Sequence, residues 1–362
     1  MTQENLLFSL LRSALWSESL LGEVPKELFA EVMKLAQEQT VYGLMFDAIS
    51  QHSVKGQFDK RLVLEAYAKT EKIKRNNALV DNELKGLVRM FDENNVDYLV
   101  VKGQTYGRLY PNPEIRMAGD IDFLIYQDYP YVKEVIEQQF TVTLPDKMIE
   151  GEIGFKHGGV PFELHTSLRT YAKKKHQKVW NSMIEKEWQD GYCVEIDGVK
   201  VRTLSPTLNA AYVFIHLFFH FIREGVSLRQ LCDWAMVLHH YQNEIDRIFL
   251  SKLLSDLDLS DAFRAFGTIL TDWLGLPDNE FPLPLSDNDR RWQKKILKDI
   301  FGGGNFGKLH HQTHNSWKFK METLQLMIRN TFRYYHLCPS EIGGMMHRQL
   351  KANLKIIIET IK

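Results

Sequence analysis

Two neighbouring stretches decide the fold of this chain: Tyr98-Leu99-Val100-Val101-Lys102-Gly103 and Arg116-Met117-Ala118-Gly119-Asp120-Ile121-Asp122-Phe123-Leu124-Ile125. The first is a short apolar run that ends in glycine, which predicts a buried strand followed by a turn. The second predicts another strand, and this one carries two carboxylates. Because side chains alternate along a strand, Asp120 and Asp122 are expected to leave the same face.

Two carboxylates that point the same way repel each other unless a cation lies between them or one keeps its proton. Oxygen ligands of this kind suit Mg²⁺, which binds one or two carboxylates, several waters and the phosphates of a substrate. The pair Asp120 and Asp122 therefore favours a metal–phosphate site over a purely structural role.

The turn before this strand supports the same interpretation. Gly103 stands between the first strand and a helix expected from Gln104 to Tyr110, with Thr105 as a candidate cap. A glycine at this place lets phosphate oxygens approach backbone N–H groups, and the helix dipole adds to the attraction. Lys102 and Arg116 can supply positive charge for the rest of a triphosphate. The alternative is that both are surface charges flanking a turn.

These residues resemble a known family. The motifs Lys102-Gly103, Leu109-Tyr110-Pro111, Arg116 and Gly119-Asp120-Ile121-Asp122 are similar to those of the uncharacterised nucleotidyltransferases of the polymerase-beta-like superfamily. Toxin-type nucleotidyltransferases with a Lys-Gly-Gly turn are also similar. The resemblance covers roughly Asp81 to Pro206. It implies an α+β fold: a polymerase-beta-like nucleotidyltransferase core with a small mixed sheet, flanked by N- and C-terminal helical domains.

The chain departs from the family pattern at two places. Gln104 follows Gly103 where the family usually has serine or glycine, and the gap from Gly103 to Asp120 is long. Both departures leave the details of triphosphate binding open, whereas the metal site is unaffected.

The superfamily pattern implies a third carboxylate on a later strand. Residues 154–165 predict a hairpin that turns at Gly158-Gly159. In its second arm Glu163 and His165 share the face opposite to Phe162 and Leu164. Glu163 can complete a metal cluster, and the alternative is an exposed residue on a half-buried strand. His165 can position substrate or act as a base, or it can be a hydrogen-bonded structural residue.

Hydrophobic periodicity divides the chain into three parts. Residues 1–70 form an N-terminal helical segment, and residues 71–204 form the catalytic core. The core begins with one long helix over 71–95 and ends with a hairpin at Asp197-Gly198. Residues 205–362 form a C-terminal helical domain, which opens with Ser205 as cap and Pro206 at the first helical position.

Composition sets the broad class of protein. Hydrophobic residues make up 44% of the 362 residues, as in an ordinary globular protein. Lys and Arg number 45 against 46 Asp and Glu, which disfavours long nucleic acid as a partner. Three unpaired cysteines fit a reducing cytoplasm. No signal peptide and no membrane-spanning stretch is apparent, so a soluble cytoplasmic protein is expected.

Three other motifs resemble functional signatures and are interpreted as structural. Residues 302–308 match most of a phosphate-binding P-loop, but Leu309 stands where the Ser or Thr that binds Mg²⁺ is required. His216 and His220 have the spacing of a zinc-protease helix, but Leu217 replaces its glutamate. The third motif is the histidine cluster of residues 310, 311 and 314, which we interpret as a surface loop.

The sequence therefore supports one main hypothesis, the transfer of a nucleoside monophosphate from a nucleoside triphosphate, such as ATP, to a hydroxyl acceptor that the sequence does not identify. Asp120 and Asp122 would hold two Mg²⁺ ions, or Mn²⁺ ions instead, about 3.5–4 Å apart. Glu163 would complete this metal site and help to deprotonate the acceptor hydroxyl. The residues expected to bind nucleotide are Lys102, Gly103, Gln104, Arg116 and His165.

Two rival hypotheses belong to other classes. The core can survive as a catalytically silent module that binds a nucleotide or a partner, and Gln104 in the turn mildly favours this. A carboxylate-pair glycoside hydrolase needs one neutral and one ionised carboxyl group in different environments. Asp120 and Asp122 are neighbours on one strand and share an environment, which argues against the hydrolase.

Overall fold

The computed structural model describes residues 2–18, 24–52, 57–149, 151–304, 316–344 and 346. The chain divides into two compact units. The first consists of Met1–Arg169 with Ile184–Asn209, and the second of Thr170–Met183 with Ala210–Lys362.

A four-stranded mixed sheet lies at the centre of the first unit. Its strands are β1 (Tyr98–Val101), β2 (Ile121–Ile125), β3 (Glu152–His157) and β4 (Val160–His165), in the spatial order β1-β2-β4-β3. β1 pairs with β2 and β3 with β4 in antiparallel fashion, whereas β2 and β4 run parallel. The two strands predicted on either side of the glycine turn are present as β1 and β2, and the hairpin turns at Gly158-Gly159 as expected.

One face of the sheet forms the hydrophobic core of this unit with two helices, α4 (Lys60–Glu93) and α6 (Tyr129–Phe140). Phe123 of β2 and both Phe162 and Leu164 of β4 are completely buried in this core. The alternation predicted for β4 is thus confirmed, because its apolar residues face the helices. The functional candidates of the same strand leave the other face.

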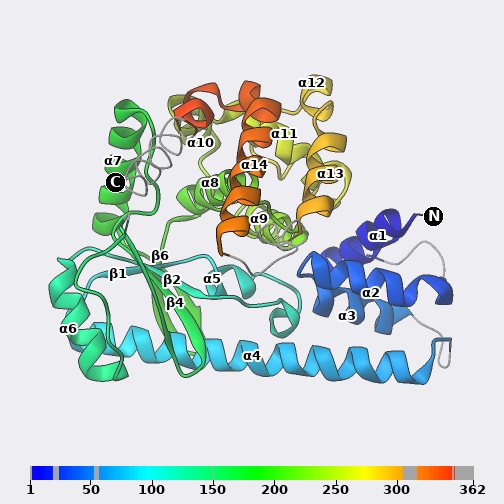
Figure 1. The fold of residues 1–362 in the computed structure, drawn as a ribbon, viewed down its shortest axis with the longest axis horizontal. Coiled ribbons are helices and arrows are strands. Elements are labelled where there is room, and N and C mark those ends of the chain that lie inside the picture. Colours follow the sequence, from blue (N-terminus) through cyan, green and yellow to red (C-terminus); the bar gives the residue numbers. More distant parts are fainter. Residues whose placement is uncertain are drawn as a thin grey trace. The chain divides into compact units, whose positions relative to one another are not determined.

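The long helix α4 is the longest element of the described chain (Figure 1). It begins at Lys60, well before the start predicted at residue 71, because Asp59 caps it by accepting hydrogen bonds from Arg61 N and Leu62 N. Its first turns carry exposed apolar residues such as Leu64, so the hydrophobic period that reveals a packed helix is weak there. The later turns pack under the sheet.

The remaining helices of the N-terminal region pack on one another, and one of them, α3, packs on α4. They are α1 (Gln3–Trp16), α2 (Phe29–Glu38), α3 (Tyr42–His52) and the short 3-10 helix η1 (Lys26–Leu28). Their buried faces are rich in leucine, and Leu7, Leu10 and Leu11 are completely buried.

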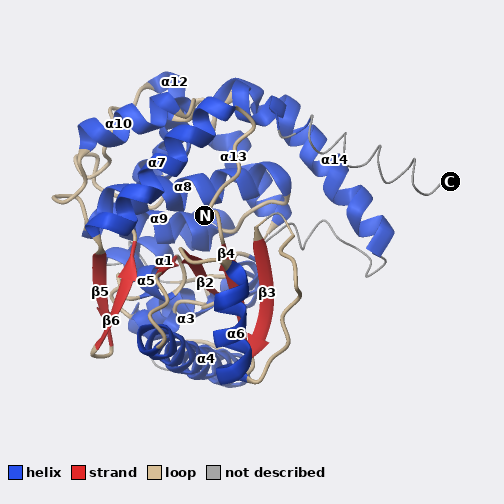
Figure 2. Ribbon diagram, turned by 90° about the vertical axis from the view of Figure 1, so that its left-hand side faces the viewer, coloured by secondary structure: helices blue, strands red, loops and turns tan. Residues whose placement is uncertain are grey.

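A separate two-stranded ribbon completes the first unit (Figure 2). It consists of β5 (Tyr192–Ile196) and β6 (Val199–Thr203), and it follows helix α7 (Lys174–Asp190). Asp197 and Gly198 both have positive φ, 46° and 77°, as the predicted Asp-Gly hairpin turn requires. β6 lies beside β1.

The second unit is helical in its described part. Aromatic residues are buried in its core, where Phe214 contacts Trp234 and Phe263 with ring centroids 5.0 Å away in each case. No helix of the described residues is long and apolar enough to cross a membrane. The helices are the part of α7 up to Met183, the part of α8 (Pro206–Arg223) from Ala210 onward, α9 (Leu228–His240), α10 (Arg247–Asp256), α11 (Ser260–Asp272), α12 (Asp287–Arg290), α13 (Gln293–Gly303), α14 (Ser316–Tyr334) and η4 (Tyr335–Leu337).

The motifs interpreted as structural fall in this second unit. Gly302 and Gly303 end α13, and the rest of the P-loop-like run from residue 305 lies outside the described residues. The histidine cluster of residues 310, 311 and 314 also lies outside them. His216 and His220 lie on α8 with ring centroids 4.3 Å apart, and neither belongs to a metal-ligand group among the residues described. The fold is α+β, with a small mixed sheet flanked by helices, as predicted.

Candidate active site

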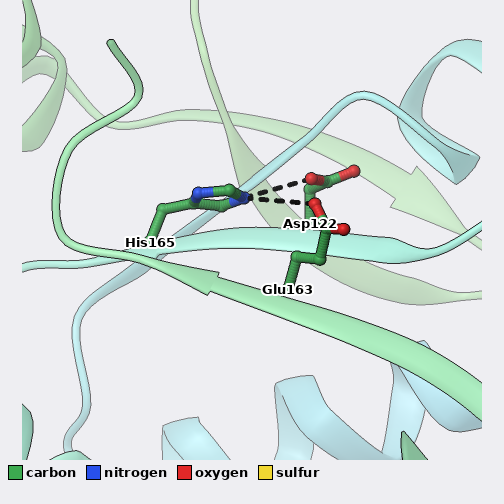
Figure 3. Close-up of side chains that lie close together, drawn as sticks. All are labelled: Asp122, Glu163 and His165. Atoms are coloured by element: carbon green, nitrogen blue, oxygen red, sulfur yellow. Dashed lines mark hydrogen bonds and ion pairs between the residues drawn. The ribbon is translucent and has the colours of Figure 1, made fainter. Parts of the chain in front are cut away.

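Two acidic residues from different strands face each other on the sheet. β2 and β4 are parallel neighbours, and their register places Asp122 opposite Glu163 and Leu124 opposite His165. Because side chains alternate, Asp122, Glu163 and His165 leave the face that α4 does not cover. Figure 3 shows the three side chains converging above the two strands.

The distances within this group suit a metal ion. His165 Nε2 lies 3.1 Å from Asp122 Oδ1 and 3.9 Å from Glu163 Oε2. One ligand atom from each residue lies within 4.8 Å of the others, and no second such group occurs among the described residues. Two carboxylates and one imidazole are donors that divalent cations accept in proteins.

Lys102 neutralises the most buried member of the group. Its backbone lies in the left-handed region at φ 61°, and this turn brings Nζ to 2.7 Å from Asp122 Oδ1. The side chains of both residues are largely removed from solvent. Lys102, expected either to bind phosphate or to be a surface charge, is thus the counter-ion of Asp122.

The two facing carboxyl groups differ in acidity. Burial alone would raise the pKa of Asp122, but Lys102 and His165 together outweigh it and hold this pKa well below its ordinary value. Burial, followed by the charges of Asp122 and Asp120, raises the pKa of Glu163 to about 9. At neutral pH Asp122 is therefore ionised, while Glu163 keeps its proton as long as no cation is bound.

Asp120 lies immediately before β2 and is half-buried. It is not a member of the group formed by Asp122, Glu163 and His165, although its charge contributes to the raised pKa of Glu163. The structure thus brings Asp122 and Glu163 together, as predicted, with His165 as the third donor of the group. A metal-binding role for Asp120 stays a prediction.

Gly103, in the predicted turn, lies against the backbone of Asp120. It has φ 50°, and a Cβ atom added to it would lie 3.1 Å from the carbonyl oxygen of Asp120. A side chain at this position would be strained by both the dihedral and the close approach. Helix α5 (Gln104–Gly107) follows and ends earlier than predicted. Thr105 is not its cap, because its hydroxyl donates to the Lys102 carbonyl at 2.7 Å.

Gln104 and Arg116 lie beside this turn. The side-chain amide of Gln104 donates to Asp81 on α4. Arg116 is buried, and its Cδ lies 3.4 Å from the position that a Cβ of Gly107 would take. The structure therefore places Arg116 against α5, and a nucleotide-binding role for these two residues stays a prediction.

Three residues near the site were missed by the sequence analysis. Glu152 of β3 pairs with His165 across the hairpin, with Oε2 3.8 Å from Nδ1. The register of the predicted hairpin would have located Glu152. Asn77 and Asp81 of α4 contact the loops of the site, and no local motif marks them, because polar residues recur throughout this helix.

Comparisons with known proteins point to one family. The sequence profile of a family described as "Uncharacterised nucleotidyltransferase" matches residues 25–275, a longer stretch than the motifs alone cover. A crystal structure of an antigenic nucleotidyltransferase-like protein from Paracoccidioides brasiliensis is similar, with 14% identity and a TM-score of 0.33. The alignment covers 59% of this chain and 96% of that one. No curated protein matches the chain significantly. From the profile match, the chain belongs to the family of uncharacterised nucleotidyltransferases.

Proposed function

We propose that the protein transfers a nucleoside monophosphate from a nucleoside triphosphate to a hydroxyl acceptor. The observation that carries this proposal is the pair Asp122 and Glu163, which face each other on parallel strands beside the Gly103 turn. A carboxylate pair next to a glycine turn that opens a helix is an arrangement suited to metal-bound phosphates. Membership of the family supports the same reaction class.

The donor set fits a divalent cation. Asp122 is already ionised, and Glu163 becomes a second oxygen ligand when it loses its proton. Asp120 and His165 are further candidates for the same role. When bound, Mg²⁺ would neutralise the charge that develops on the phosphates during transfer. Two Mg²⁺ ions, or Mn²⁺ in their place, are the cofactors that this proposal expects.

The protein groups have separate tasks in this reaction. The backbone amides that follow Gly103 would hold the departing pyrophosphate, and Lys102 and Arg116 would supply positive charge there. Glu163, once a bound cation has favoured its ionised form, would accept the proton of the acceptor hydroxyl. Asp122 keeps a fixed negative charge on the sheet throughout.

The proposal can be tested with purified protein, Mg²⁺ and each of the four α-labelled nucleoside triphosphates. A panel of acceptors would contain sugars, polyols, amino-acid hydroxyls and tRNA, and pyrophosphate release would be measured. We expect Asp122→Asn to lower the transfer rate by at least ~100-fold, which is the order of loss when one group that stabilises transition-state charge is removed. The control is Asp146→Asn, which alters a carboxylate that is 93% exposed and pairs with Lys133 of α6. Equal transfer by wild type and Asp122→Asn would rule out the mechanism.

The second candidate is a silent module that binds nucleotide without turnover. The favouring observation is Gln104, whose side chain turns back to α4 where the family usually has a small residue. Isothermal titration with Mg²⁺ and triphosphate separates the two. Binding without transfer to any acceptor of the panel supports the module.

A further inference from the structure

Two polar side chains of α4 reach the loops that form the proposed site. Asn77 and Asp81 are one helical turn apart and so lie on the same side of the helix. Asn77 is 5% exposed, and its Nδ2 atom donates to two backbone carbonyl oxygens, those of Glu114 and Arg116, at 2.6 Å each.

These two hydrogen bonds fix the segment that leads to Asp120. The acceptors flank Ile115, the last residue of the 3-10 helix η2 (Pro113–Ile115), in a loop without a strand partner. A side-chain amide has two N–H donors on one nitrogen and can serve both carbonyls. A carboxylate of the same shape would place oxygen lone pairs against these carbonyls, so asparagine is required by its chemistry and not only by its size.

Asp81 holds the other segment of the site, because it accepts the hydrogen bond from the side chain of Gln104. The segments held by Asp81 and by Asn77 also touch each other. Gly103 lies against the Asp120 carbonyl, and Arg116 packs against Gly107. The glycine turn and the segment from Glu114 to Asp120 therefore form one layer that is anchored to α4 at two points.

We infer that Asn77 and Asp81 are positioning residues, which hold the Gly103 turn and the segment carrying Arg116 and Asp120 in the placement that triphosphate binding requires. This inference rests on the proposed function. It also accounts for the departure at Gln104, whose side chain supplies the partner that Asp81 needs. Neither Asn77 nor Asp81 has to touch the substrate.

The anchoring is tested first without any ligand, by amide hydrogen exchange of the full chain. In Asn77→Ala and Asn77→Asp we expect at least tenfold faster exchange over residues 113–120, and in Asp81→Ala over residues 102–107. The matched control is Lys85→Ala, which removes a contact of the same helix to Asp197 in the β5–β6 turn, 3.1 Å long. Unchanged exchange in both loops of the variants would overturn the inference.

The consequence for binding is tested with Mg²⁺ and α,β-methylene-ATP by calorimetry. We expect Asp81→Ala to weaken binding about tenfold, and Asp81→Asn to stay within about twofold of wild type, because its Oδ1 can still accept from Gln104. A merely structural role would not produce this rescue. Gln104→Leu removes the same hydrogen bond from the other side and should match Asp81→Ala, which keeps the test valid if one variant does not fold.

The outcomes separate the two proposals. If the wild type binds the triphosphate, and Asp81→Ala and Asn77→Ala bind it equally well, the positioning roles are wrong. The proposed function then still stands. Absence of triphosphate binding by the wild type overturns the proposed function, and the exchange experiment alone then decides whether Asn77 and Asp81 anchor the two loops.

Discussion

At the scale of single residues, the site is controlled by how its charges are compensated. Glu163 has a pKa of about 9 in the folded chain, against 4.5 for an unperturbed glutamate. Between these values the folded metal-free protein holds a proton that the unfolded chain has released. The contribution of Glu163 to the free energy of unfolding must therefore fall as the pH rises from 4.5 to 9, because deprotonation favours the unfolded state there.

Replacing Glu163 by glutamine should remove this pH dependence. We expect the Tm of metal-free wild type to drop between pH 6 and pH 9 by at least ~2 °C more than that of Glu163→Gln. Added Mg²⁺ should restore the wild type and leave the variant unchanged. Glu195→Gln, at an exposed position of β5, is the control that should follow the wild type. Parallel Tm curves for wild type and Glu163→Gln would contradict the assigned pKa.

We expect Lys102 to stabilise the fold independently of any role in catalysis. Its removal leaves the Asp122 carboxylate, 2% exposed, without its closest cation. Loss of one partner from a buried ion pair costs about 3–5 kcal/mol, so Lys102→Met should lower the free energy of urea unfolding by roughly 3 kcal/mol. The double variant Lys102→Met with Asp122→Asn should recover most of this lost free energy of unfolding. If Asp122→Asn lowers the free energy of unfolding and Lys102→Met does not, the two residues are not coupled.

At the scale of the elements, two helical glycines allow opposite predictions for the same substitution. Gly43 of α3 lies against η2, and a Cβ there would come within 2.2 Å of the Ile115 carbonyl oxygen, which is backbone and cannot move aside. Gly86 of α4 has no atom within 4 Å of such a Cβ. Urea unfolding of Gly43→Ala should show a loss of at least ~2 kcal/mol, because overpacking forces the backbone to shift.

Gly86→Ala should instead raise the free energy of unfolding by about 0.5–1 kcal/mol, since alanine is the better helix former and the space is open. The same two variants report on the site, because Ile115 directly precedes Arg116. Amide exchange near Arg116 should increase in Gly43→Ala and remain unchanged in Gly86→Ala. Stabilisation by both substitutions would mean that α3 and η2 are not in contact.

What the sequence could predict follows from the range of the interactions involved. Strand alternation is local, so the opposite faces of Phe162 and Glu163 were readable, as was the Asp-Gly turn of the β5–β6 ribbon. The early start of α4 could not be predicted, because its first turns lack a packed apolar stripe. The counter-ion role of Lys102 and the ties from Asn77 depend on contacts between distant segments, and no local pattern encodes these.

At the scale of the whole molecule, the proposed site uses a small part of the chain, from Asn77 to His165, and all of it belongs to the first compact unit. A ligand that binds only the folded state raises its stability by about 2.7 kcal/mol at a concentration of 100 times Kd. Mg²⁺ with a nucleoside triphosphate should therefore slow the hydrogen exchange of β1, β2 and β4 by up to ~100-fold, wherever exchange requires unfolding of that unit.

This last prediction separates specific binding from a general effect of salt. Asp122→Asn should lose the protection, because the site then lacks the carboxylate that stays ionised at every working pH. Chelation of Mg²⁺ should abolish protection in the wild type, since the phosphates would then meet the acidic group without a neutralising cation. Protection that survives both chelation and Asp122→Asn would place the triphosphate elsewhere on the molecule. In that case the carboxylates of β2 and β4 would need another explanation.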